Sequence, residues 1–220
     1  MIKAVVFDMD GLMIDTERLL VKYWIEAAHH YGYAMKAEHI IGIRSLEAKY
    51  AIPKLKAEIG NDFDYYKVRT LRIKLMADHI EQHGLDEKPG LGKLLEYLKQ
   101  HCYLTAVATA TDPERTRRYL ESLDRLKYFD RIVCASMVEN GKPAPDIYLK
   151  AASELKVNPV ECMALEDSPN GILSAYRAGM CPVMIPDLSQ PDEELRRMLY
   201  ACVDNLENVI ELLERHKSQA

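Results

Sequence analysis

Two aspartates one residue apart follow a short apolar segment near the beginning of the chain. Asp8 and Asp10 come directly after the run IKAVVF at residues 2–7. In extended backbone, residues i and i+2 project to the same side, so both carboxylates can face one ligand. Two acids this close repel each other and favour a cation between or beside them. An aspartate pair before Gly11 is also typical of a turn. The pair therefore indicates either a cation-dependent site or a simple turn.

Polar residues also follow later apolar runs. Thr109 and Ala110 come after the run at residues 103–108, just before a predicted helix. A hydroxyl and backbone N–H groups near a helix start can cradle a phosphate, although they can also simply cap the helix. Lys142 lies in the segment GKPAPD at 141–146. One glycine and two prolines hold this lysine firmly, which suits either a site or a rigid solvated turn.

A second acid pair, Glu166 and Asp167, follows the apolar run at residues 162–165. Taken alone, it could be the N-cap region of a helix that starts at Pro169. Taken with the other motifs, it completes a set of acids, hydroxyl and lysine at four strand ends. In a doubly wound sheet those ends meet at one crevice. The combined set is what phosphoryl transfer requires.

The elements that would position these residues alternate between strand and helix from about residue 90 onward. Repeated alternation predicts a parallel sheet with helices on both faces. The predicted strands lie at residues 103–108, 132–134, 162–165, 181–185 and 201–203. The predicted helices lie at residues 91–100, 112–123, 145–155, 169–179, 192–199 and 206–215.

The segment between the first strand and this alternating part has helical periodicity and almost no strand signal. Helices are predicted at residues 16–31, 45–59 and 62–83. We therefore expect an α/β protein with two domains. A doubly wound, Rossmann-like core comprises residues 1–14 and 89–220, and a helical cap at residues 15–88 is inserted into it.

Composition excludes several classes of partner. The chain has 220 residues and a net charge of −5, without a basic stripe, so no nucleic-acid partner is expected. No stretch approaches the roughly 20 apolar residues of a membrane span, and the first residues lack a signal-peptide pattern. The 5 cysteines form no Cys-x-x-Cys motif, which is typical of a reducing compartment. We expect a cytoplasmic monomer.

The motifs, in this order, resemble those of the haloacid dehalogenase-like superfamily of phosphohydrolases. DMDG at 8–11 resembles its first motif, Thr109 its second, Lys142 its third and the 166–167 pair its fourth. Residues 12–17, 141–146 and 165–171 are similar, more narrowly, to the branch that contains β-phosphoglucomutase and sugar-phosphate phosphatases. The resemblance covers essentially the whole chain, including the placement of the cap.

The resemblance implies a mechanism that agrees with the chemistry of the residues. Asp8 would attack phosphorus and form an aspartyl-phosphate. Asp10 would protonate the leaving oxygen and then activate the hydrolytic water. Thr109, the amide of Ala110 and Lys142 would bind the transferred phosphoryl group.

The resemblance also implies a cofactor, Mg²⁺. The ion would be held by the carboxylates of Asp8 and Asp167 and by the backbone carbonyl of Asp10, with Glu166 as a nearby outer ligand. Oxygen ligands completed by waters are what Mg²⁺ prefers.

The expected function is a Mg²⁺-dependent phosphatase of a small phosphorylated metabolite, with a sugar phosphate favoured. Arg44, in the segment GIRS at 42–45, is the candidate cap residue for substrate binding. A phosphosugar mutase is the alternative. The mutases of this family carry a histidine where Leu20 stands here, and their cap arginine lies one position after Arg44. Both departures favour the phosphatase.

Overall fold

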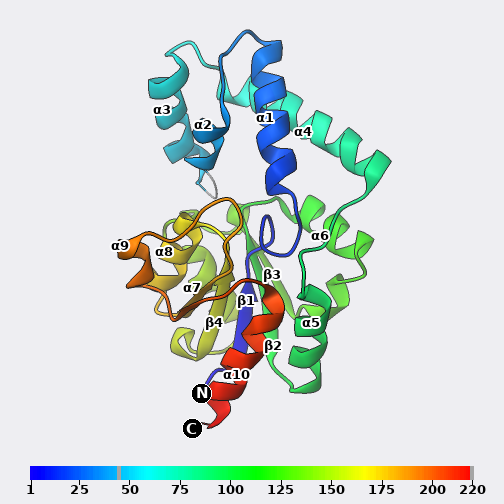
Figure 1. The fold of residues 1–220 in the computed structure, drawn as a ribbon, viewed down its shortest axis with the longest axis vertical. Helices are drawn as coiled ribbons and strands as arrows, with labels where there is room; N and C mark the ends of the chain where they lie inside the picture. Colours follow the sequence, from blue (N-terminus) through cyan, green and yellow to red (C-terminus); the bar gives the residue numbers. More distant parts are fainter. Residues whose placement is uncertain (44–45, 219–220) are drawn as a thin grey trace.

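The computed structural model describes residues 1–43 and 46–218 and shows a layer of helices above the end of a parallel sheet (Figure 1). The strand order is β3-β2-β1-β4-β5-β6, and every neighbouring pair is parallel. The strands are β1 (Ala4–Phe7), β2 (Leu104–Thr109), β3 (Arg131–Cys134), β4 (Cys162–Glu166), β5 (Cys181–Met184) and β6 (Ala201–Cys202). The chain winds outward from β1 in one direction and then resumes at β4 on its other side. This switch point opens a crevice at the carboxyl ends of β1 and β4.

Alternating residues of β1 build two separate cores, one on each face of the sheet. Ala4 and Val6 belong to the cluster with α7 (Asp146–Leu155) and α8 (Pro169–Arg177). Val5 and Phe7 belong to the cluster with α5 (Leu91–Gln100), α6 (Pro113–Ser122) and α10 (Val209–Ser218). Because both faces are buried, the strand has the continuous apolar run seen in the sequence. The predicted α/β class and doubly wound sheet are confirmed.

Among the element boundaries that differ from the prediction, two bear on the sheet. Thr109 is the last residue of β2 and not the first of the following loop. The helix expected at 192–199 is only α9 (Glu193–Arg196). The N–H of Tyr200 already donates to the carbonyl of Pro182, 2.8 Å away, so the chain must leave the helix early to join the sheet edge.

The cap consists of α1 (Glu17–His30), α2 (Ala37–Ile41), α3 (Ala48–Ile59) and α4 (Tyr65–His83), and it packs around a core of its own. Trp24, Leu55 and Val68 lie at the centre of that core. The five-residue helix α2 was not predicted, because it is too short to show helical periodicity. The predicted helix at 45–59 begins at Ala48, and its first expected residue lies outside the described part of the chain.

The two connections between cap and core are hydrogen-bonded to each other. The N–H of Asp15 donates to the carbonyl of Asp86, and that of Lys88 donates to the carbonyl of Met13, both over 2.9 Å. The Lys88 ammonium also forms an ion pair with Asp187, 2.9 Å away in the core. These contacts hold the cap over the carboxyl ends of the strands (Figure 1). Within the described residues, no helix combines the length and the apolarity that crossing a bilayer requires.

Candidate active site

Asp8 is fixed at the point where β1 ends, beside β4. Its N–H donates to the carbonyl of Leu165 over 3.0 Å, and the residue is 3% exposed. The loop then turns at Gly11, whose φ is +87°. A Cβ at Gly11 would lie 2.2 Å from Oδ2 of Asp167. Glycine is therefore required both by the backbone conformation and by the close approach of the Asp167 carboxylate.

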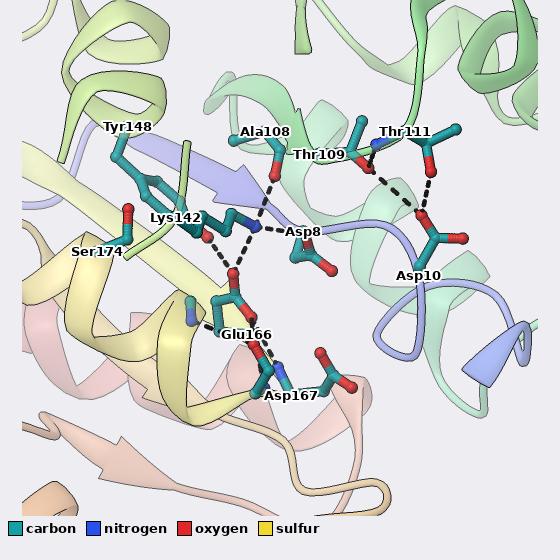
Figure 2. Close-up of polar contacts among 12 residues, drawn as sticks. Asp8, Asp10, Ala108, Thr109, Thr111, Lys142, Tyr148, Glu166, Asp167 and Ser174 are labelled. Atoms are coloured by element: carbon teal, nitrogen blue, oxygen red, sulfur yellow. Dashed lines mark hydrogen bonds and ion pairs between the residues drawn. The ribbon is translucent and has the colours of Figure 1, made fainter. Parts of the chain in front are cut away.

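Lys142 lies directly behind Asp8. Its Nζ donates to Oδ1 of Asp8 at 2.5 Å, to Oε1 of Glu166 at 2.6 Å and to the carbonyl of Ala108 at 3.0 Å (Figure 2). All three ammonium hydrogens can be used in this way, which explains how a lysine can be 2% exposed. The lysine is a buried counter-ion and not a solvated turn residue.

The loop that carries Lys142 is tied down on both sides. On the core side, the Ser174 hydroxyl donates to the carbonyl of Ala144. On the cap side, the N–H of Gly141 donates to Oε2 of Glu47 over 2.9 Å. The position of Lys142 thus depends on the core and also on a contact with the cap.

Both carboxylate oxygens of Glu166 accept hydrogen bonds from the protein. Oε1 accepts from Lys142 and from the Tyr148 hydroxyl at 2.7 Å, and Oε2 accepts from the Ser168 hydroxyl at 3.2 Å. A Cβ at Gly171 would lie 1.9 Å from this carboxyl group, so the first turn of α8 must carry glycine there. The Glu166 carboxylate is therefore held toward Lys142 and Tyr148.

Asp8, Glu166 and Asp167 form a buried acidic cluster, with ligand oxygens within 4.8 Å of one another. Only the Lys142 ammonium pairs with Asp8 and Glu166 among the described residues, so the ionised cluster has excess negative charge. Burial, and then the charges of Glu166 and Asp167, raise the pKa of Asp8 well above its ordinary value despite the lysine. Burial lowers the pKa of Lys142, but Asp8 and Glu166 outweigh it and raise that pKa.

Asp10 is held by three threonine hydroxyls, two of which, those of Thr109 and Thr111, are shown in Figure 2. Its Oδ1 accepts from Thr16 at 2.7 Å, and its Oδ2 accepts from Thr111 at 2.7 Å and from Thr109 at 3.4 Å. Asp8 and Asp10 both line one cavity between core and cap, as their alternation along the chain predicted. The carboxylate of Asp10 is thus oriented by groups from the core and from the first cap connection.

Four of the eight predicted site residues line that cavity. Thr109 and Ala110 line it with the two aspartates, and Leu20 lines it from the cap. Lys142, Glu166 and Asp167 lie buried beneath it, within reach of Asp8. The predicted substrate-binding residue Arg44 lies outside the residues that the structure describes.

Four residues of the site had no predicted role. Thr16 and Thr111 hold Asp10, and Tyr148 holds Glu166. Arg72 lines the cavity from α4 and is 6% exposed. The sequence contains one indication of a role for Arg72, which is its place on the buried face of α4. The buried residues of that helix are Tyr65, Val68, Arg72 and Met76. A charged residue on the apolar stripe of a helix deserves a functional explanation.

Comparisons of the sequence with known proteins identify the family of this chain. The family model of the haloacid dehalogenase-like hydrolases matches residues 5–185. A phosphorylated carbohydrates phosphatase of Thermotoga maritima is 33% identical over 180 residues, which cover 81% of this chain and 82% of that one. The fructose-1-phosphate phosphatase YqaB of Escherichia coli is 30% identical, over 80% of this chain and 93% of that one.

A β-phosphoglucomutase of Clostridium difficile shares the fold, with a TM-score of 0.82 over 100% of this chain and 98% of that one. Its sequence identity is 22%, so this likeness concerns the fold alone. The family match and the phosphatase relatives confirm the predicted class of enzyme, a phosphoric monoester hydrolase. The chain belongs to the haloacid dehalogenase-like hydrolases, as its motifs predicted.

Proposed function

We propose that this enzyme hydrolyses the phosphate ester of a small metabolite, a sugar phosphate, through an aspartyl-phosphate on Asp8. The observation that carries the proposal is the placement of Asp8, which lines the cavity on one side and contacts buried Lys142 on the other. The relatives named for phosphorylated carbohydrates and for fructose 1-phosphate support the class of substrate.

In the first step, an oxygen of Asp8 bonds to phosphorus while the bond from phosphorus to the ester oxygen breaks. Asp10 donates a proton to that departing oxygen. In the second step, water attacks phosphorus, Asp10 accepts the proton of the water, and phosphate leaves with Asp8 regenerated. Thr109 and the amide of Ala110 hold the phosphoryl group throughout. Two like charges at about 4 Å cost roughly 4 kcal/mol at an effective dielectric of 20, and Lys142 offsets part of this repulsion.

The buried acidic cluster fits a divalent cation, which we propose is Mg²⁺. Asp8 and Asp167 would hold it with the backbone carbonyl of Asp10. Glu166 would act as an outer ligand, because both of its oxygens already accept hydrogen bonds. When bound, the cation would neutralise the excess charge of the cluster and polarise a phosphoryl oxygen.

The cap, proposed as residues 15–88, would exclude water and contact the part of the substrate that is not transferred. Leu20 lines the cavity, and by the resemblance mutases of this family would carry a histidine at this position. An apolar side chain cannot couple the activation of Asp10 to the binding of a sugar. Water is therefore expected to reach the aspartyl-phosphate before a second sugar hydroxyl does.

The test is a phosphate-release screen across phosphorylated metabolites, with product analysis of hexose phosphates by ³¹P NMR. We expect release of inorganic phosphate from at least one sugar phosphate, with little isomerised product. Isomerisation that outpaces phosphate release by about tenfold or more would instead establish the mutase.

The proton-transfer role of Asp10 predicts a loss that depends on the leaving group. Asp10→Asn should slow turnover by about 10²–10⁴ for alkyl phosphates, the usual range for a lost general acid-base residue. The loss should be smaller for aryl or acyl phosphates, because their leaving groups need no proton. Steady-state rates on both kinds of substrate give the comparison. Equal losses on both would rule out Asp10 as the acid.

A further inference from the structure

Arg72 places a buried positive charge in the cap wall of the cavity. The residue is 6% exposed, and its Nε has no hydrogen-bond partner among the described residues. Its Nη1 donates to the sulfur of Met76 over 4.0 Å. Within residues 1–43 and 46–218, no carboxylate forms an ion pair with it. Buried charges are normally paired with an opposite charge. The guanidinium of Arg72 therefore lacks an anionic partner within the described chain, and a bound ligand could supply one.

Nearby groups compensate the charge of Arg72 only in part: the charge of Asp10 favours the guanidinium, but among the described residues no carboxylate forms an ion pair with it. The guanidinium lies over the Trp24 ring, 5.2 Å from its centre, and this cation–π contact offsets only part of the desolvation. Burial, followed by the charges of Arg115 and Arg69, lowers the pKa of Arg72 to about 10. The group therefore remains charged at neutral pH.

The same cavity gathers two more arginines. Arg69 lines it one helical turn before Arg72 on α4, and Arg115 lines it from α6 of the core. Arg115 is already paired with Asp112, whereas Arg72 forms no ion pair within the part of the chain that the structure describes. Positive side chains from cap and core thus converge on a cavity that also contains Asp8 and Asp10. The three arginines balance the carboxylates of Asp8, Asp10 and Glu17 in this lining, and an anion bound beside Arg72 would meet a positive charge on the cap side.

We propose that the substrate carries a second anionic group, a carboxylate or a second phosphate, which binds to Arg72 with the help of Arg69. This inference rests on the proposed phosphatase function and narrows its class of substrate. The phosphoryl group lies at Asp8, and the second anion lies at the cap. The planar guanidinium, with its free Nε–H, can bind either anion through two parallel hydrogen bonds.

The test compares matched substrates that differ in the second anion. Fructose 1-phosphate is paired with fructose 1,6-bisphosphate, and glycerol 3-phosphate is paired with 3-phosphoglycerate. We expect kcat/KM for phosphate release to favour the doubly anionic member of at least one pair by about tenfold or more. The pair that shows the preference identifies the second group as phosphate or as carboxylate.

The variant Arg72→Met keeps an apolar chain against Trp24 and removes the charge. It should lower the preference ratio by about 10- to 100-fold, the range for a lost charge-assisted hydrogen bond. Arg72→Lys should retain part of the preference, which a purely structural role would not predict. Lys74→Met, on the exposed face of the same helix, is the matched control and should leave the ratio unchanged.

The outcomes separate this inference from the function on which it rests. Hydrolysis of the esters with no preference in either pair would overturn the second-anion site and leave the phosphatase intact. A preference that survives in a folded Arg72→Met variant would also overturn it. No hydrolysis of any phosphate ester would contradict the proposed function itself.

Discussion

Asp8→Asn is expected to abolish turnover while the fold survives. The asparagine keeps the shape of the side chain but removes the charge that attacks phosphorus, so activity should fall to background. Because the pKa of Asp8 is raised by burial among other carboxylates, the charged form destabilises this site in the absence of a cation. The metal-free variant should therefore melt at or above the temperature of the metal-free wild type.

The measurement is phosphate release together with thermal denaturation on freshly prepared protein, before the asparagine can deamidate. Glu47→Gln is the companion variant. It weakens the contact between the cap and the Lys142 loop and leaves the buried acidic cluster of Asp8, Glu166 and Asp167 unchanged. Its turnover should fall far less than that of Asp8→Asn. Activity near the wild-type value in a folded Asp8→Asn variant would overturn the assignment of the nucleophile.

Removal of divalent cations is the second change with a very large expected effect. Chelation should abolish phosphate release and added Mg²⁺ should restore it, because the excess negative charge around Asp8 would otherwise repel the phosphate ester. Asp167→Ala should raise the Mg²⁺ concentration required for half-maximal activity by about tenfold to a hundredfold or more. Full activity after exhaustive chelation would establish a metal-free mechanism.

The same charges predict how stability depends on pH. Without a cation, the folded protein retains the Asp8 proton at pH values where the unfolded chain has lost it. Stability should therefore fall as pH rises from the ordinary carboxyl range, near 4, toward the raised pKa of Asp8. Stabilisation by Mg²⁺ should grow over the same interval, because the ligands must be deprotonated. Melting temperatures with and without Mg²⁺ between about pH 5 and 8 test both trends; a Mg²⁺ effect independent of pH would contradict them.

Much of this architecture was determined by local sequence. Buried parallel strands produce short apolar runs, and helices produce an apolar stripe with recognisable caps. Asp112 and Ser168, for example, each stand before a proline and cap α6 and α8 with their side chains. The acids, Thr109 and Lys142 could be located because each lies at or after the carboxyl end of a strand, and parallel strands bring these ends to one edge.

What only the tertiary structure decided is which of these groups face one another. Tyr148 reaches Glu166 across α7 and β4, and Glu47 reaches the Lys142 loop from the cap. Neither contact has a signature in sequence spacing, because it depends on how helices pack against a sheet and on where the cap lies. Arg72 differs in kind: the periodicity of α4 predicts its burial, but only the cavity between cap and core shows that its charge lacks a partner among the described residues. Local sequence specifies elements and their faces, whereas the pairing of buried charges is a property of the assembled fold.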